Sequence, residues 1–447
     1  MRQKRTMLAV TLTLLLALLL SACSGNGSNG NSNGTSAASS NPSKEPVMQE
    51  VEITFANWIS VEDATKDIYN DLMDEFEKQN PGITVKSIGY PFNQYKDQVL
   101  VSSAGGNAPD VIMANQNFTS AFVGADIAAP MDELLEASLI DDILEGSLKG
   151  VTYGNKVMAM PWAPHPNALF WNKKLFEKAG LDPNTPPQTW DEMLMMADKI
   201  AKLGQDEKGN PIYGIGENTK DTSYTGNMLY RIVLSYGGKF VDDEGKVVFD
   251  EGTALRDALA YIQTLVTNKT SPKGAEIFDL RGMFGNGTLG MVSDGDFGRS
   301  VFRGTSGKGE AFDEEWGVTT IPVNQSNQSE TVFTEHQLVI SKDGKQKDAA
   351  AKLVTFLVSE DAMKMYHAAN GVLSSRKSIA ALPEMNEDEY AKVFNAQMAT
   401  ATALPTQNPK FDNAMKEAAS MVVMVSEGST PEEAIARIMP KIKELYQ

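Results

Sequence analysis

The chain has 447 residues, more than the roughly 250 to 300 at which a single hydrophobic core stops growing, so we expect at least two lobes. Hydrophobic residues make up 42% and charged residues 22%, which is typical of a soluble globular protein and excludes a disordered chain or a membrane bundle for the bulk of it. The net charge is −18 and no long run of lysine or arginine is present, which argues against a nucleic-acid partner.

The first 23 residues have the pattern of an export signal. Basic residues among the first five precede Met7 to Leu20, a run of apolar residues and threonines that is short for a membrane span. The run ends in Leu20-Ser21-Ala22-Cys23, which resembles the lipobox of bacterial lipoproteins and implies that Cys23 becomes the acylated N-terminus. A diacylglyceryl group at this position would anchor the chain stably. The alternative is a stop-anchor helix with an incidental cysteine.

The next segment, residues 24–50, is rich in glycine, serine and asparagine. It contains too few apolar residues to bury a core, so we expect a flexible tether. Such a tether spans on the order of 30 Å and would hold a domain away from the bilayer. Folding is therefore expected to begin near Val51.

From Val51 onward, apolar periodicity alternates between strand and helix patterns, which indicates an α/β fold with a parallel sheet. Strands are predicted at 51–55, 83–86 and 111–113, and helices at 68–76, ending at Asn80-Pro81-Gly82, and at 94–104. Pro161, Pro164 and Pro166 predict an irregular, extended crossover. Beyond it, strands are predicted at 168–171, 289–292 and 338–340, and a helix that opens with a Thr189/Glu192 capping box.

Several motifs occur in a characteristic order along this part of the chain. They are Phe76-Glu77-Lys78-Gln79-Asn80-Pro81-Gly82, Ala108-Pro109-Asp110-Val111-Ile112, Ala168-Leu169-Phe170-Trp171-Asn172-Lys173-Lys174-Leu175-Phe176 and Pro187-Gln188-Thr189-Trp190-Asp191-Glu192. Together with the upstream lipobox, this order resembles the maltose-binding-protein-like, family 1 extracellular solute-binding proteins of ABC sugar importers. The resemblance runs from about Val51 to the C-terminus.

The resemblance implies a two-lobed fold of the type 2 periplasmic-binding-protein class, with parallel-sheet lobes that interleave in sequence and join at hinge crossovers. Lobe one would comprise residues 48–162 and 322–362, and lobe two residues 163–321 and 363–447. The implied function is capture of a carbohydrate, an oligosaccharide in our prediction, by interlobe closure and delivery to an ABC transporter permease. We expect a monomer on the outer face of the cell membrane, without a cofactor and without catalytic activity.

Ligands of open α/β sheets lie beyond the carboxyl ends of parallel strands, so the turns after the predicted strands are the expected site. Sugars need flat apolar faces and planar groups that bind hydroxyl pairs. Trp58, Trp162 and Phe297 are the predicted stacking residues. The remaining ligand-binding candidates are Asn115, Gln116, His165, Tyr224, Asn227, Asp294, Asp296, Glu335 and Phe411. The alternative for Trp58 and Trp162 is core packing, and for Asp294 and Asp296 a simple turn around Gly295.

Other functions stay open at this level. A glycoside hydrolase would need two carboxylates across a sugar-sized gap, for which Glu335 would have to partner Asp294 or Asp296. A binding protein for an amino acid, polyamine or phosphate ester, and an adhesin or sensor-associated protein, are further alternatives. Only His165, His336 and His367 are present, without metalloprotease spacing, and Cys23 is the only cysteine, so no metal site is expected.

Overall fold

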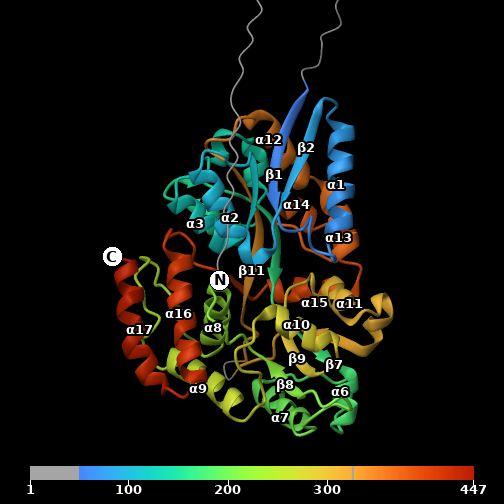
Figure 1. Cartoon of the computed structure of the whole chain (residues 1–447), viewed down its shortest axis with the longest axis vertical. Helices are drawn as coiled ribbons and strands as arrows, with labels where there is room; N and C mark the ends of the chain where they lie inside the picture. The colour runs from blue at the N-terminus through green and yellow to red at the C-terminus, as the bar shows by residue number, and fades with distance from the viewer. Residues whose placement is uncertain (1–49, 325–326) are drawn as a thin grey trace, which may run out of the picture. The chain divides into compact units, whose positions relative to one another are not determined.

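The computed structural model describes residues 50–324 and 327–447 (Figure 1). The predicted signal segment with Cys23 and nearly all of the predicted tether, residues 1–49, lie outside the described residues. Within the described residues, no helix is long and apolar enough to cross a membrane.

The first lobe contains a six-stranded sheet whose first three strands run parallel, as the sequence predicts. β1 pairs with β2 along its whole length and with β3 through Phe55 and Ala56. β11 closes the arrangement by running antiparallel to β3 and to β6. The strands are β1 (Val51–Asn57), β2 (Ile83–Gly89), β3 (Val111–Ala114), β6 (Met160–Pro166), β11 (Thr331–Ile340) and β12 (Ala401–Ala403).

The second lobe contains a four-stranded sheet in the order β10-β7-β9-β8. Only β8 and β9 are parallel in this sheet, because β7 runs antiparallel to both β9 and β10. The buried apolar runs from which these strands are predicted indicate coverage of both faces but carry no information on direction. The strands are β7 (Ala168–Asn172), β8 (Tyr213–Gly216), β9 (Leu289–Asp294) and β10 (Trp316–Thr319), and β4 (Thr152–Tyr153) and β5 (Lys156–Val157) form a separate hairpin.

Helices cover both sheets. In the first lobe α1, α12 and α13 pack together and α12 lies against β1 (Figure 1). The helices associated with this lobe are α1 (Lys66–Gln79), α2 (Phe92–Ala104), α3 (Gln116–Gly124), α4 (Ala137–Asp141), α5 (Glu145–Val151), α12 (Lys347–Leu357), α13 (Glu360–Asn370) and α14 (Lys377–Ala380), with short 3-10 turns at Met131–Glu133 and Pro383–Met385.

In the second lobe α8, α9, α16 and α17 form a bundle at one side of the sheet (Figure 1). Gly226 of α8 allows the closest of these contacts, since a Cβ there would lie 2.1 Å from the Met415 carbonyl oxygen of α16. The helices are α6 (Lys173–Lys178), α7 (Trp190–Ala201), α8 (Ser223–Ser235), α9 (Ala254–Thr267), α10 (Ile277–Gly285), α11 (Gly298–Ser306), α15 (Glu389–Met398), α16 (Phe411–Ser426) and α17 (Pro431–Leu445), with a 3-10 segment at Gly309–Glu315.

Local sequence signals account for the helix ends. The predicted capping box of α7 is present, because Glu192 N donates to Thr189 Oγ1 at 3.2 Å and Thr189 N donates to the Glu192 carboxylate at 3.3 Å. α1 ends where predicted, and Asn80 N donates to the Phe76 carbonyl oxygen at 2.9 Å. Such contacts satisfy backbone groups that helix ends leave unpaired.

The proline-rich crossover differs from the prediction of irregular structure. Pro161, Pro164 and Pro166 lie inside strand β6, which is fully buried and pairs with β11. β6 has β11 as its only ladder partner in the part of the chain that the structure describes, so it is an edge strand. Edge strands tolerate proline because the missing N–H faces no second neighbour.

Each lobe has its own hydrophobic core. The core around the first sheet includes Met363, Tyr366, Ile379 and Met385, although the sequence assigns residues from 363 onward to lobe two. The second sheet has its own cores, which bury residues such as Leu169 and Phe170 on opposite faces of β7. The exact lobe boundaries stay a prediction.

Candidate functional site

A cavity of about 130 Å³ is lined by both lobes. The carboxyl ends of the parallel strands β1 and β3 meet at one edge of the first sheet, and the residues that follow them form one wall, as open α/β sheets favour. The first lobe contributes Trp58, Ile59, Glu62, Ala64, Thr65, Phe92, Asn115, Gln116, Asn117, Phe118, Thr334, Glu335, His336 and Tyr366. The second lobe contributes Ser223, Tyr224, Asn227, Ile277, Phe278, Arg281, Phe297, Ser300 and Val301.

Trp58 is the centre of an aromatic wall. Its ring lies edge-on to those of Phe92, Tyr95 and His336, with centroid separations of 5.3, 5.1 and 5.3 Å. The side chain is only 3% exposed. Edge-to-face contacts of this kind fix ring orientation, so the wall is rigid before any ligand arrives.

Arg281 of α10 is the cation of the opposite wall. Its Nε and Nη2 atoms donate to the two carboxylate oxygens of Asp294 at 2.7 and 2.9 Å, and its guanidinium lies 5.0 Å from the centroid of the Phe297 ring. Burial opposes the charge on Arg281, but the Asp294 carboxylate outweighs it and raises the pKa of Arg281. Asp294 therefore fixes and neutralises the arginine from behind the lining.

Carboxamides from both lobes meet across the cavity. Asn227 Nδ2 of α8 donates to Asn117 Oδ1 of α3 at 2.7 Å. Among the described residues, Asn117 Nδ2, Asn227 Oδ1 and His336 Nδ1 have no hydrogen-bond partner, although all three atoms are buried. Buried polar atoms are normally paired, so these three are available to a ligand.

Asn115 and Gln116 line the cavity, but their side chains are engaged within the protein. Asn115 Oδ1 accepts a hydrogen bond from Phe118 N at 2.9 Å and caps α3. Gln116 Oε1 accepts one from Glu335 N at 2.7 Å, which ties α3 to β11. Both residues shape the wall, and a ligand would reach only their remaining hydrogen-bonding capacity.

Glu335 is a buried acid in the lining of the cavity. Burial raises the pKa of Glu335 to about 7, against the smaller opposing effect of neighbouring hydrogen-bond donors such as Gln337 Nε2, which donates to Glu335 Oε2 at 3.1 Å. Glu62 also belongs to the lining, and burial raises its pKa while the charge of Arg281 opposes the rise. Desolvation is the dominant cause at both carboxyl groups.

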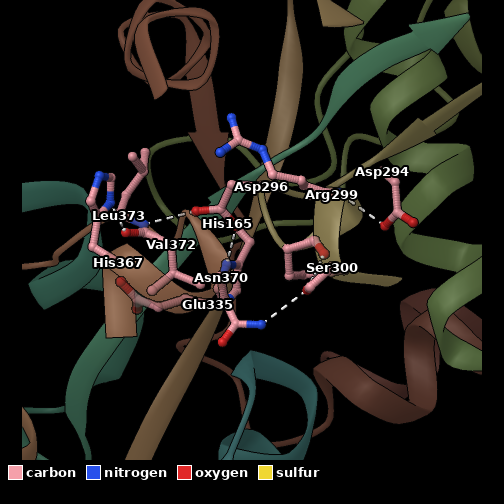
Figure 2. A network of polar contacts seen from close by, with 12 residues as sticks. His165, Asp294, Asp296, Arg299, Ser300, Glu335, His367, Asn370, Val372 and Leu373 are labelled. Atoms are coloured by element: carbon pink, nitrogen blue, oxygen red, sulfur yellow. Dashed lines mark hydrogen bonds and ion pairs between the residues drawn. The ribbon is translucent and has the colours of Figure 1, made fainter. Parts of the chain in front are cut away.

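His165 and Asp296 form a buried pair just behind the lining (Figure 2). His165 Nδ1 lies 2.5 Å from Asp296 Oδ1, and Leu373 N donates to the other oxygen at 2.8 Å. Burial lowers the pKa of His165 and raises that of Asp296 well above its usual range. The His165 ring lies 4.2 Å from the His336 ring, which faces the cavity.

The structure brings together seven of the twelve candidate ligand-binding residues in one lining. They are Trp58, Asn115, Gln116, Tyr224, Asn227, Phe297 and Glu335. His165, Asp294 and Asp296 support the lining from behind and do not belong to it. Cys23 lies outside the described residues.

Trp162 and Phe411 do not belong to the lining of the cavity: Trp162 packs behind the lining residues Tyr366 and His336, and Phe411 lies in the core of the second lobe. The Trp162 ring lies 5.0 Å from the Tyr366 ring, and its Nε1 donates to the Leu357 carbonyl oxygen at 2.9 Å. Phe411 is fully buried at the start of α16 and contacts Phe240. Both rings are buried in core packing. Core packing is the alternative that the sequence left open for Trp162.

Sequence reasoning missed several lining residues. Glu62 and Phe92 follow the predicted strands β1 and β2 but lie several residues beyond the strand ends, and Phe278 and Arg281 lie on helix α10, which follows no predicted strand. The spacing of Phe278 and Arg281 on one side of α10 was a possible signal, because residues three apart share a helix face. Nothing in the local sequence indicated which way that face points.

Comparison with known proteins gives the class. The family model described as bacterial extracellular solute-binding protein matches residues 62–364, and the chain belongs to this family of binding proteins. Related proteins include one of Brucella abortus named as a binding protein, 27% identical over 79% of this chain and 81% of its own. YcjN of Escherichia coli, named as a periplasmic-binding protein of an ABC transporter, is 26% identical over 71% of each chain. A Streptomyces antibioticus protein named as a lipoprotein is 27% identical over 64% of this chain and 62% of its own.

Solved structures agree on the fold. A solute-binding protein of an ABC transporter from Thermotoga lettingae, bound with α-D-tagatose, superposes with a TM-score of 0.80 at 24% identity, over 89% of this chain and all of that one. Maltose-bound MalE3 of Thermotoga maritima gives a TM-score of 0.77 at 23% identity, over 88% of this chain and all of that one. The chain therefore has the two-lobed fold of MalE-like proteins.

Proposed function

We propose that the chain captures a carbohydrate, most simply an oligosaccharide, in the cavity between its lobes and delivers it to the permease of an ABC transporter. The observation that carries the proposal is the combination of a rigid aromatic wall around Trp58 with unpaired polar atoms on Asn117 and Asn227. Flat apolar faces suit the C–H surfaces of sugar rings, and carboxamides both donate to and accept from hydroxyl groups.

The charges of the lining support a neutral ligand. Among the described lining residues, Arg281 is the only lysine or arginine, and Asp294 already neutralises it. Glu62 and Glu335 add acidic groups. A phosphate ester or the carboxylate of an amino acid would find no free cation here, whereas a polyamine stays a second candidate because of the two acids.

Two structural neighbours were solved with sugars bound. The Thermotoga lettingae protein was solved with tagatose and the Thermotoga maritima protein with maltose. At 24% and 23% identity these structures speak to the fold, so the sugar class is our inference from the lining.

We further propose that ligand binding favours closure of the lobes, because only the closed state offers both walls at once. In the structure the lobes already touch through Asn117 and Asn227, and through an ion pair of 2.5 Å between Lys96 and Asp412. The moving bodies would be close to the predicted residues 48–162 with 322–362 and residues 163–321 with 363–447, except that residues 363–385, which pack in the core of the first sheet, would move with the first lobe. Small-angle scattering should show smaller dimensions at ligand saturation, and unchanged dimensions would contradict closure.

The proposed location is the outer face of the cell membrane, with the monomeric chain anchored by a lipid on Cys23. The related Streptomyces antibioticus lipoprotein is consistent with such an anchor. Metabolic labelling with a tagged fatty acid should mark the wild-type chain in membranes and leave a Cys23→Ser variant unlabelled. Equal labelling of both chains would refute the anchor.

We propose that the chain is not an enzyme. Asp294 is paired with Arg281, and Asp296 with His165, so neither aspartate is free to act as the second carboxylate of a glycoside hydrolase beside Glu335. Prolonged incubation with oligosaccharides should leave them intact. Stoichiometric cleavage products would favour the hydrolase instead.

A ligand screen tests the central proposal. Thermal unfolding of the full chain should shift upward with at least one mono- or oligosaccharide, because a ligand that binds only the folded state stabilises it. Calorimetry should then give one site per chain. A shift with polyamines alone, with no response to any saccharide, would replace carbohydrate by a cationic ligand.

A further inference from the structure

Phe278 lies at the edge of the cavity and is unusually exposed for a large aromatic residue. Its side chain is 41% exposed, and its ring lies 6.0 Å from the Phe92 ring of the other lobe. The same residue lines a second, open groove of about 710 Å³ on the second lobe. Phe278 is therefore the boundary between the two concave sites.

The helical geometry of α10 explains why the cavity and the groove meet at Phe278. Residues advance by about 100° around an α-helix. Ile277, Phe278 and Arg281 line the cavity and lie within about 100° of one another. The groove-lining residues of α10 occupy the next sector, with Phe278 between the two. They are Phe278, Asp279, Gly282, Met283 and Asn286.

The turn between α7 and β8 forms the wall of the groove opposite α10. Asp206 organises this turn, because its Oδ1 accepts hydrogen bonds from Asn210 N at 2.8 Å and Lys208 N at 2.9 Å. Its Oδ2 accepts one from Asn210 Nδ2 at 2.8 Å and so holds that carboxamide in place. A fixed polar group loses little conformational entropy when it binds a ligand.

The groove is more polar than the cavity, but it offers both kinds of group that a sugar needs. Asn210, Asn286 and Asp279 supply planar polar groups, and Tyr213 and Met283 supply apolar surface. Small-molecule sites usually measure about 300 to 1,000 Å³. The cavity of about 130 Å³ is small for more than a short saccharide, so a longer one has to leave it.

We propose that this groove is an outer subsite that binds the part of an oligosaccharide extending from the cavity across the ring of Phe278. The inference rests on the proposed carbohydrate function and adds that the ligand is a chain long enough to occupy both sites. The exposed ring gives the sugar a stacking surface at the point where it crosses α10.

Gly282 offers a direct way to block the groove. A Cβ at this position meets no heavy atom within 4 Å, so a Gly282→Phe side chain would project into free space and fill the groove without disturbing the core. Gly304→Phe on α11 is the matched control, because a Cβ there is equally unobstructed and lines neither site. Asn286→Ala removes one polar group of the groove and leaves the cavity lining untouched.

The test is calorimetric titration of the full chain with a graded series of saccharides of one linkage type. In the wild type, affinity should rise with chain length by about tenfold or more, the gain expected from a stacked ring and its hydrogen bonds. Gly282→Phe should abolish that gain and leave the shortest ligand at wild-type affinity, Asn286→Ala should reduce it, and Gly304→Phe should behave as wild type. Hydrogen exchange of residues 206–213 should slow only with the long ligand.

The outcomes separate the two proposals. Equal affinity for short and long saccharides, or a Gly282→Phe variant that binds the long ligand as wild type does, would refute the outer subsite and leave the carbohydrate cavity standing. Absence of binding by every saccharide would refute the proposed function and the subsite together.

Discussion

Asn227 of the second lobe donates a hydrogen bond of 2.7 Å across the cavity to Asn117 of the first lobe. The pair leaves Asn117 Nδ2 and Asn227 Oδ1 without a protein partner among the described residues. This contact therefore helps to join the lobes and presents one donor and one acceptor at the place where they meet. The same two side chains are suited to bind a ligand hydroxyl and to hold the closed state.

Asn227→Ala should weaken ligand binding by about tenfold and cost about 1 to 3 kcal/mol of stability, because Asn117 would then be buried without its partner. Titration and urea unfolding measure the two effects. Asn395→Ala is the control, since Asn395 donates to Asn386 at the same distance of 2.7 Å outside the cavity. It should leave ligand affinity at the wild-type value, and equal losses in both variants would show that the cross-cavity bond has no special role.

Trp58→Phe should preserve the fold and lower ligand affinity by about 1 to 2 kcal/mol, because a smaller ring offers less stacking surface. The ligand-induced change in tryptophan fluorescence should also disappear, although four of the five tryptophans remain. Trp316→Phe, in the core of the second lobe, should retain both affinity and the fluorescence change. Full affinity in Trp58→Phe would contradict the aromatic wall.

Asp294→Ala should destabilise the chain by about 3 to 5 kcal/mol, because it leaves the Arg281 guanidinium buried without its counter-charge. Urea unfolding gives the value. Asp313→Ala breaks an arginine–aspartate pair with Arg303 whose side chains are 27% and 31% exposed, and should cost about 1 kcal/mol or less. Similar losses in the two variants would mean that burial does not set the strength of the Arg281 pair.

Glu335 should make the stability of the fold depend on pH. Its folded-state pKa of about 7 lies above the ordinary value of 4.5, so its protonated form stabilises the fold below pH 4.5 and this stability is lost as pH rises towards 7. The loss amounts to about 3 kcal/mol by pH 8. Glu335→Gln should remove this loss, so the difference in unfolding free energy between variant and wild type should grow from pH 5 to pH 8. A difference independent of pH would show that Glu335 does not titrate in this range.

Gly226→Ala should destabilise the chain by about 1 to 3 kcal/mol, because the added methyl group collides with the Met415 carbonyl oxygen and pushes α16 from α8. Gly304→Ala, in a helix where a Cβ meets nothing within 4 Å, should instead stabilise it by about 0.5 to 1 kcal/mol. Thermal and urea unfolding compare the two. Stabilisation by Gly226→Ala would contradict the tight helix contact.

Elements whose signals are local could be predicted from the sequence. The alternation at Val51, Ile53 and Phe55 indicated β1, and the Thr189/Glu192 spacing indicated the start of α7. These signals reside in residues a few positions apart, so no distant contact is needed to form them. The order of the motifs also indicated the family, since such an order survives when the individual residues that touch a ligand change.

The site depended on contacts that the sequence does not contain. Trp58 and Trp162 looked equivalent, yet Trp58 faces the cavity whereas Trp162 is covered by Tyr366 from α13, some 200 residues further along the chain. Arg281 lines the cavity because the fold places helix α10 across the cavity from Trp58, which follows β1. Asp294 pairs with Arg281 and does not belong to the lining. Local periodicity determined which segments form helices and strands. Packing between segments distant in sequence decided which side chains remained free to bind a ligand, because burial and pairing depend on neighbours that only folding supplies.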